Sequence, residues 1–152
     1  MKYSIHLLCT NIKTMKYLIV LFSLLFCFTS YSQDASLKIL ADGFQSDKGQ
    51  ALYMIFENAD GFPKNLDKAY RSGKMNIQNG QATTNITGLP EGVYAVIIVH
   101  DEDKNGKLKT NWIGMPKEGV GNSNNPKGFP SFSKSSFSLK GNGFLRIEIV
   151  YL

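Results

Sequence analysis

The chain has 152 residues, a formal net charge of +5, 43% hydrophobic residues and 19% charged residues. This length suits one domain of ordinary size, and the balance of apolar and charged residues excludes a disordered chain, a collagen and a long coiled coil. The 14 glycines and 5 prolines predict many turns between short elements.

The first segment, residues 1–32, contains no acidic residue and combines a basic start with an apolar run from Tyr17 to Phe28. A helix over this run extends about 18 Å, which is shorter than a bilayer core of about 30 Å. Ser30-Tyr31-Ser32 then places small residues where a signal peptidase cleaves. We therefore expect a signal peptide over 1–32, with Met15 as an alternative start, and one domain over 33–152. A membrane anchor or a core helix is the alternative.

Removal of this signal peptide would take away both cysteines, Cys9 and Cys27, and would lower the formal charge to +2. A nearly neutral mature chain has no electrostatic basis for nucleic-acid binding. Without cysteine it forms no disulfide and no cysteine-ligated zinc site. Phe26 stands where a lipoprotein needs a small residue before Cys27. We expect a secreted or periplasmic protein with no lipid anchor, no transmembrane segment after cleavage and no nucleic-acid partner.

The remaining chain alternates short apolar stretches with turn residues. The predicted strands are Ser36–Ala41, Ala51–Glu57, Lys74–Gln78, Gln81–Thr87, Gly92–His100, Phe137–Leu139 and Leu145–Tyr151. Asn79-Gly80 predicts a tight hairpin because both residues tolerate positive φ. The second strand is apolar on both faces, which predicts a strand covered on both sides or a central one. The fifth is continuously apolar and should lie at the centre of the sheet, whereas the last alternates and predicts one buried face. About seven strands and no long helix predict an all-β fold, a single antiparallel β-sandwich.

Residues 101–135 contain no predicted strand and many glycines and prolines. Loops longer than about 12–15 residues are uncommon in compact domains unless they have a role or are disordered. Apolar residues in this segment favour order over disorder: Trp112, Ile113, Met115, Phe129 and Phe132. We therefore expect one long ordered loop.

The start of this loop has the spacing of a calcium-binding loop. Asp101, Asp103 and Asn105 occupy positions one, three and five of a twelve-residue frame, and Gly106 occupies position six. A hard cation needs six to eight oxygens, and a glycine lets the backbone bend so that the next carbonyl can contribute. Lys109 and Trp112 depart from the pattern, so Asn111 or Glu118 would have to supply further oxygens. The predicted metal ligands are Asp101, Asp103, Asn105, Lys107, Asn111 and Glu118.

The dissociation constant for calcium at these ligands should be about 10⁻⁴–10⁻³ M, as in extracellular modules. The alternative is a turn without metal, in which side chains satisfy the backbone through hydrogen bonds. Both alternatives give the loop a defined shape.

A second set of residues is predicted to contact a ligand: His100, Trp112, Asn122, Asn124 and Phe129. Amide side chains beside aromatic rings suit sugar recognition, so the expected partner is a glycan, a peptide or an envelope protein. Alternatively, Trp112 and Phe129 fill the end of the sandwich as core residues.

Catalysis has little support in the sequence. His100 is the only histidine outside residues 1–32, and its neighbour Asp101 must point to the opposite face of a strand. No nucleophile elbow is present, and one histidine without cysteine does not make a catalytic zinc site. We expect a non-enzymatic binding or accessory module. The alternatives are a structural or assembly component of an envelope complex, which docks through a sheet edge or loop, and a hydrolase that uses His100.

Several motifs between Gly92 and the C terminus occur in a fixed order: Gly92-x-Tyr94, His100-Asp101, Asn105-Gly106-Lys107-Leu108, Asn111, Ile113-Gly114-Met115-Pro116, Glu118-Gly119, Gly121-Asn122-Ser123-Asn124 and Gly128-Phe129-Pro130. In this combination the chain resembles a family of secreted bacterial proteins known as domain of unknown function 2141. Leu89 to Tyr94 also resembles the start of the central strand in prealbumin-like and carboxypeptidase-regulatory-like sandwiches. The resemblance implies a β-sandwich outside the cytoplasm, with an acid usual at the position of Lys109, and it implies no particular activity.

Overall fold

The computed structural model describes residues 34–63, 65–109 and 116–151. The predicted signal peptide, and Asn111 and Trp112 among the predicted site residues, lie outside the described residues. Within the described residues the strands and helices are, in chain order, β1 (Asp34–Asp42), β2 (Gln50–Phe56), η2 (Leu66–Lys68), β3 (Arg71–Met75), β4 (Ile77–Gln78), β5 (Gln81–Pro90), β6 (Gly92–Asp101), β7 (Val120–Asn122), α2 (Phe132–Ser135), β8 (Phe137–Leu139) and β9 (Asn142–Glu148). In this part of the chain no helix is long and apolar enough to cross a bilayer.

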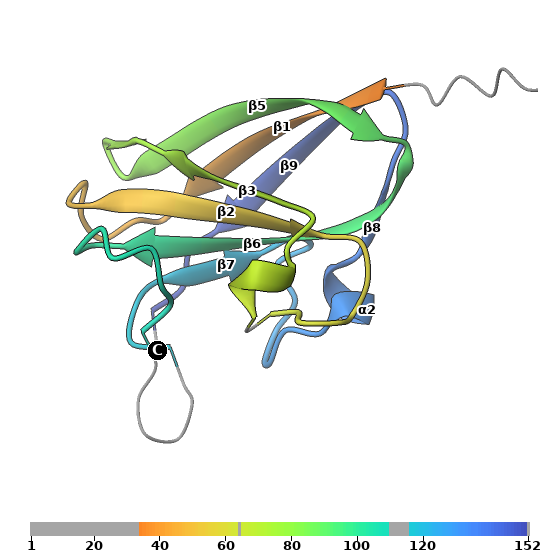
Figure 1. The fold of residues 1–152 in the computed structure, drawn as a ribbon. Helices are drawn as coiled ribbons and strands as arrows, with labels where there is room; N and C mark the ends of the chain where they lie inside the picture. Colours follow the sequence, from red (N-terminus) through yellow and green to blue (C-terminus); the bar gives the residue numbers. More distant parts are fainter. Residues whose placement is uncertain (1–33, 64, 110–115, 152) are drawn as a thin grey trace, which may run out of the picture. The chain divides into compact units, whose positions relative to one another are not determined.

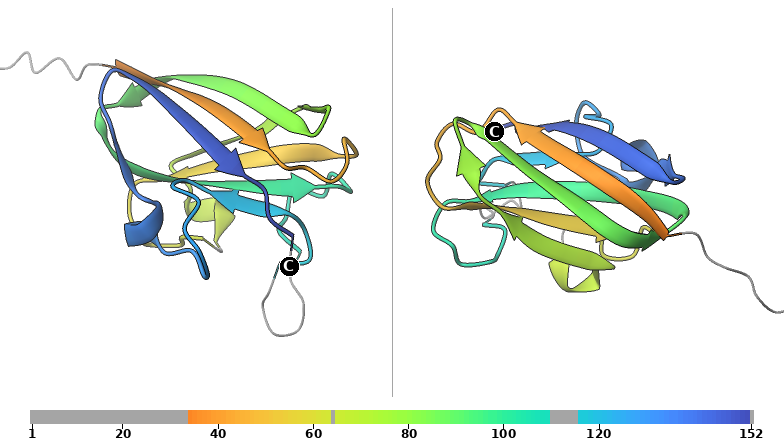
Figure 2. Two further views of the ribbon diagram at one scale, coloured as in Figure 1. Left: turned by 180° about the vertical axis from the view of Figure 1, so that it is seen from behind. Right: turned by 90° about the horizontal axis from the view of Figure 1, so that it is seen from above.

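Two sheets pack face to face as a β-sandwich (Figures 1 and 2). The four-stranded sheet has the order β4-β5-β1-β9, and the five-stranded sheet has the order β3-β2-β6-β7, with β8 also paired to β6. The predicted all-β sandwich is therefore confirmed. The predicted number of about seven strands is too low for the described residues, because the predicted strand Lys74–Gln78 is divided between β3 and β4, and because β7 is short and carries few apolar residues.

The prediction of a purely antiparallel sandwich is wrong at one pair of strands. β1 and β9 run parallel, with Ser36 opposite Asn142 and Asp42 opposite Glu148, whereas the other strand pairs of the described chain are antiparallel. The alternation of apolar residues marks which face of a strand is buried. It carries no information about the direction of the neighbouring strand, which the connections determine.

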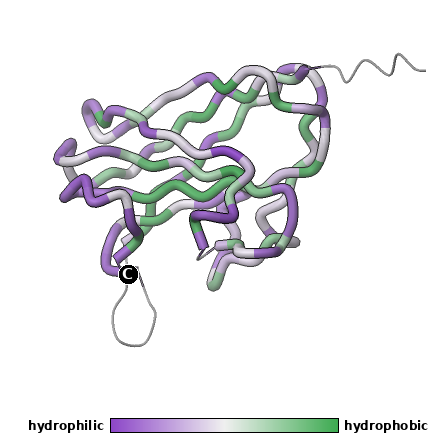
Figure 3. The backbone as a smooth tube through the Cα atoms, viewed as in Figure 1, coloured by the Kyte–Doolittle hydropathy of each residue, from purple (hydrophilic) through white to green (hydrophobic). Residues whose placement is uncertain are grey.

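The interior between the sheets follows from this alternation. On β1, Leu37 and Ile39 are fully buried, while Lys38 between them is exposed. Side chains of the same kind from both sheets complete this core: Ile55, Ile86, Leu89, Tyr94, Val96, Ile98, Leu139 and Ile147. Figure 3 shows the result, with hydrophobic residues mainly along the strands and hydrophilic residues at many of the turns. Burial of these side chains is the main contribution to the stability of the sandwich.

The five-stranded sheet is covered on its outer face as well. Leu52, Met54, Phe56, Ile97 and Val99 form a second apolar cluster on that face. The residues that cover this cluster come from the connecting segments, from β7, from η2 and from α2: Phe62, Leu66, Ala69, Leu108, Val120 and Phe132. The second strand is therefore covered on both sides, as predicted, and the fifth, β6, lies inside its sheet, as predicted. The segments that cover this face include parts of the 101–135 region.

The predicted hairpin at Asn79-Gly80 is confirmed, but its first strand is divided between the sheets. Asn79 and Gly80 have φ of 52° and 72°, and the Asp47 carboxylate accepts a hydrogen bond of 2.8 Å from each backbone N–H. Met75 ends β3 in one sheet, whereas Ile77 begins β4 in the other. Both side chains are buried, so the apolar alternation continues through the crossing and does not reveal it.

The Gly-x-Tyr motif at the start of β6 has a clear structural role. The Tyr94 hydroxyl donates a 2.8 Å hydrogen bond to the carbonyl of Pro90, four residues earlier. The Tyr94 ring lies against Gly92, where an added Cβ would be 3.4 Å from the ring. Such a bond from tyrosine to an upstream carbonyl resembles the tyrosine corner of Greek-key sandwiches. It fixes the turn between β5 and β6, where the chain passes from one sheet to the other.

The residues after β9 join the two sheets. The backbone N–H of Ile149 donates to the carbonyl of Asp42 on β1, at 2.8 Å. The next residue, Val150, exchanges two backbone hydrogen bonds of 3.0 Å with Val120 on β7. Gly121 makes this approach possible, because a Cβ there would lie 2.5 Å from the carbonyl oxygen of Glu148.

The predicted 101–135 loop therefore needs a correction, because the segment contains β7 and α2. The residues of β7, Val120-Gly121-Asn122, carry little apolar signal, because their glycine serves a close backbone contact rather than side-chain burial. This packing places the residues just before β7 beside the end of β6.

Candidate functional site

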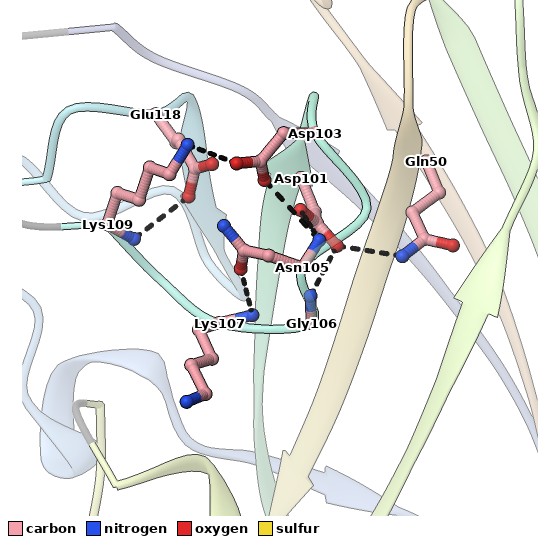
Figure 4. A network of polar contacts seen from close by, with 8 residues as sticks. All are labelled: Gln50, Asp101, Asp103, Asn105, Gly106, Lys107, Lys109 and Glu118. Carbon is pink, nitrogen blue, oxygen red and sulfur yellow. Dashed lines mark hydrogen bonds and ion pairs between the residues drawn. The ribbon is translucent and has the colours of Figure 1, made fainter.

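The candidate site begins where β6 ends, at Asp101. This carboxylate is fully buried and accepts three hydrogen bonds, from Gln50 Nε2 at 2.7 Å, Asn105 N at 3.0 Å and Gly106 N at 2.9 Å (Figure 4). Two of these donors are backbone groups of the turn that follows. Asp101 therefore closes that turn and fixes it to the start of β2 through Gln50.

The turn after Asp101 is held by its own side chains. Asn105 Oδ1 accepts a 2.7 Å hydrogen bond from Lys107 N, and Asp103 Oδ1 accepts a longer one of 3.4 Å from Asn105 N. Gly106 has φ of 73°, which agrees with the bend predicted at this position. Lys107 contributes its backbone N–H, and its side chain points away from the carboxylates (Figure 4).

The Glu118 carboxylate lies beside this turn, although Glu118 comes from just before β7. Its Oε2 accepts a 3.0 Å hydrogen bond from Lys109 N, and Lys117 N donates to the carbonyl of Lys109 at 2.9 Å. One carboxylate oxygen each of Asp101, Asp103 and Glu118 then lies within 4.8 Å of the others. The side chains come from the end of β6, the following turn and the residue before Gly119, so the cluster joins both ends of the connection between β6 and β7.

The charge of this acidic cluster is balanced by Lys109. Its ammonium donates a hydrogen bond to Asp103 Oδ2, and this bond lowers the pKa of Asp103 to about 2. The same contact with Asp103 raises the pKa of Lys109, and the negative charges of Glu118 and Asp101 act in the same direction. Burial raises the pKa of Glu118, which is 8% exposed. Lys109, at position nine of the calcium-loop frame, therefore supplies a positive charge at the cluster.

These residues fit a metal ion only in part. Three carboxylates within 4.8 Å could hold a divalent cation. However, Asp101 already accepts hydrogen bonds on both oxygens, and Asn105 directs its oxygen to Lys107 N. A cation would also have to displace the Lys109 ammonium from Asp103 or share that carboxylate with it. The geometry thus has features of both alternatives that the sequence left open: a turn whose side chains accept hydrogen bonds from its own backbone, and a cluster of carboxylates.

His100 lies inside the protein, on the opposite face of β6 from Asp101. It is fully buried, with Nδ1 2.6 Å from the Tyr151 hydroxyl and Nε2 2.8 Å from the carbonyl oxygen of Lys48. Because a carbonyl can only accept, Nε2 carries a proton and donates it to Lys48, while Nδ1 is hydrogen-bonded to Tyr151. The ring also makes an edge contact with Phe44, at 5.2 Å between centroids. Both ring nitrogens are therefore used within the fold, and no part of the ring faces solvent.

Asn122 and Asn124 hold the segment after β7 to α2. Asn122 Nδ2 donates to Ser135 Oγ at 2.8 Å, and Asn124 Nδ2 donates to the carbonyls of Ser136 and Lys134 at 2.9 and 3.2 Å. Phe129, in contrast, is 75% exposed. The alternative that Phe129 fills the end of the sandwich is therefore wrong.

Two residues that organise this region were not among the predicted site residues. Gln50 is uncharged and orients Asp101 by donating a hydrogen bond to its carboxylate, and the Tyr151 hydroxyl is hydrogen-bonded to His100. Neither has a local sequence signal, because each acts on a residue about fifty positions away. Lys109 was recognised only as a departure from the calcium-loop pattern, although the same departure marks it as the partner of Asp103.

The family described as "Uncharacterized protein conserved in bacteria (DUF2141)" matches residues 39–145. This match covers most of the chain, so the protein belongs to that bacterial family. No curated protein and no solved structure shows significant similarity to the chain.

Proposed function

We propose that this member of the DUF2141 family is a non-catalytic binding or accessory module that acts outside the cytoplasm, and that segment 101–135 is its recognition part. The observation that carries the proposal is the contrast within this segment. Asp101 at its start and Ser135 at its end are buried in hydrogen-bonded contacts, whereas Phe129 between them is exposed to solvent. A fixed base with an exposed aromatic residue suits recognition, because little conformational entropy is lost on binding. The signal-peptide pattern of residues 1–32 supports the location.

The absence of catalysis is supported by His100. A general base must come within hydrogen-bond reach of a substrate proton. His100 has no exposed surface and uses both ring nitrogens for Tyr151 and Lys48. The purified protein should therefore turn over no ester or glycoside in a broad panel, and reproducible hydrolysis of any of these would contradict this part of the proposal.

Recognition is tested by photo-crosslinking in living cells. A photoreactive phenylalanine analogue replaces Phe129 in one strain and Phe144, which is 59% exposed on β9, in a control strain. We expect adducts in the envelope fraction from position 129 and few from position 144. Equal labelling at both positions, or a protein confined to the cytoplasm, would contradict the proposal.

Weak calcium binding is a second candidate function, favoured by the convergence of Asp101, Asp103 and Glu118. These three residues would hold the ion, and the expected dissociation constant is about 10⁻⁴–10⁻³ M. Titration calorimetry of the wild type and of Asp103→Asn tests this, with magnesium as the control ion. Calcium binding that Asp103→Asn removes would support the site. No heat in the wild type at about 10 mM calcium would exclude it.

A further inference from the structure

A narrow loop between β7 and α2 extends beyond the two sheets (Figures 1 and 2). Lys127, Gly128 and Phe129 in this loop are all exposed. Among the described residues, Phe129 is the most exposed large hydrophobic side chain, at 75%. An isolated exposed apolar residue is ordinary on a protein surface, so its meaning depends on how the loop is built and on what surrounds it.

The loop is fixed at its base on two sides. Asn124 bonds to two carbonyls at the C-terminal end of α2, as described above. Asn125 bonds to β9, where its amide donates to the carbonyl of Arg146 at 3.1 Å and its oxygen accepts from Glu148 N at 2.9 Å. Asn124, Asn125 and Gly128 have φ of 65°, 42° and 83°, values that suit asparagine and glycine. The protein thus holds Phe129 outward on a defined support, and its exposure is not that of a frayed end.

The loop and α2 carry charge of one sign. Residues 123–136 contain Lys127 and Lys134 and no aspartate or glutamate, whereas at the base of the loop Arg146 is paired with Asp42 at 2.6 Å. Lys127 and Lys134, which stand on either side of Phe129 in the sequence, are both exposed. Asp60 lies in the segment that contacts α2 through Phe62 and Phe132, and its carboxylate is paired with Lys68 at 2.7 Å. The two exposed lysines therefore favour an anionic partner.

The same contacts disfavour a neutral sugar as the partner. Sugar recognition would use amide groups beside the aromatic ring, but the NH₂ groups of Asn122 and Asn124 are committed to α2 and the residue that follows it. An exposed aromatic ring flanked in the sequence by exposed lysines instead has the chemistry of a bilayer interface. Aromatic rings reside at the level of the headgroups, and each lysine near an anionic surface contributes to attraction.

We infer that Lys127, Phe129 and Lys134 form a contact site for the surface of an anionic lipid bilayer, with the Phe129 ring in the headgroup region. This inference rests on the proposed function of segment 101–135 and identifies its partner. One aromatic ring and two lysines give weak, reversible attachment that falls as salt rises.

Binding is measured by co-sedimentation with vesicles of phosphatidylglycerol and phosphatidylethanolamine, and with phosphatidylcholine vesicles as the neutral comparison. Every variant is expressed as the full chain, and mass spectrometry establishes that all are compared with the same N terminus. We expect binding to the anionic vesicles only, about tenfold weaker for Phe129→Ser and about fivefold weaker for Lys127→Gln. Phe144→Ser is the matched control and should bind as the wild type does.

A second measurement reports whether residue 129 itself contacts the lipid. Phe129→Trp should lose fluorescence in vesicles of brominated anionic lipid, whereas Phe144→Trp should not. This readout is independent of any other membrane contact made by the full chain. The inference is overturned if neither tryptophan is quenched, if both are quenched equally, or if Phe129→Ser binds as well as the wild type. Crosslinks from position 129 to a protein or glycan, without vesicle binding, would overturn it and leave the proposed function intact.

Discussion

The Nδ1 atom of His100 and the hydroxyl oxygen of Tyr151 lie 2.6 Å apart across a sequence separation of 51 residues. The same hydroxyl accepts a 3.1 Å hydrogen bond from Gln45 N, and the other nitrogen of His100 donates to Lys48. A single chain of hydrogen bonds thus connects the β1–β2 loop, the end of β6 and the C-terminal residues. His100 stabilises this end of the sandwich from within.

Removing the Tyr151 hydroxyl should therefore destabilise the protein. In Tyr151→Phe, His100 Nδ1 loses its hydrogen-bond partner and Gln45 N loses its acceptor, and we expect the free energy of unfolding to fall by about 1–3 kcal/mol. Urea denaturation measures this loss. Tyr70→Phe is the control, because Tyr70 is 44% exposed. Equal effects of the two substitutions would contradict the role given to Tyr151.

The two aspartates of the candidate site should differ strongly in their effect on stability. Asp101→Ala removes the buried acceptor of Gln50, Asn105 and Gly106, and should cost about 2–3 kcal/mol. Asp103→Ala removes a surface ion pair with Lys109 and should change stability much less. Thermal unfolding of both variants is the measurement. A larger loss for Asp103→Ala would mean that the turn is not closed by Asp101.

The contact between Asp103 and Lys109 predicts a pH dependence. The pKa of Asp103 is lowered from an ordinary value of 3.8 to about 2, so its contribution to stability is present above about pH 4 and lost as the pH falls toward 2. Glu118 has the opposite sign, because its pKa is raised, and it favours folding most below 4.5. Titration of the side-chain carboxyl carbons by NMR separates the two groups.

Lys109→Met should raise the pKa of Asp103 toward its ordinary value in the same titration. Lys107→Met is the matched control, because that side chain points away from the carboxylates (Figure 4). An Asp103 pKa that stays near 2 without Lys109 would show that another group holds the carboxylate in its charged form.

Gly119 should not tolerate a side chain. A Cβ at this position would lie 2.5 Å from Tyr151 Cζ and 2.7 Å from Ile149 Cγ2, so Gly119→Ala forces the C-terminal residues away from β7. We expect a loss of about 1–3 kcal/mol in unfolding free energy. Gly92→Ala is the comparison, because its nearest contact would be 3.4 Å from the Tyr94 ring, and it should cost little.

The sequence predicts those parts of the fold that depend on local chemistry. Asn79-Gly80 adopts the expected positive φ values, and the apolar faces of β2 and β6 are both buried. The alternation along β6 also indicates that His100 is buried, because His100 shares a face of the strand with Val96 and Ile98. In contrast, the parallel pairing of β1 with β9 depends on how distant segments connect, and local patterns do not encode that.

In the candidate site, too, local spacing predicts one part, and contacts between distant residues determine the rest. The positions of Asp101, Asp103 and Asn105 predicted a turn closed by oxygen atoms, and the backbone of Asn105 and Gly106 donates to Asp101. The sequence did not reveal that Lys109 would neutralise the cluster, because spacing alone does not show where a flexible ammonium lies. The part played by Gln50 depends on the register between β2 and β6, which places it opposite Asp101.

The hydrogen bonds from Ile149 to β1 and from Val150 to β7 also have a consequence for the order of folding. During synthesis, residues 118–121 leave the ribosome well before residues 149–151. β7, which carries Gly121, therefore lacks its outer neighbour until these later residues are made. A nascent chain interrupted before Ile149 would possess every residue of the recognition segment and still lack the partner that holds it in place.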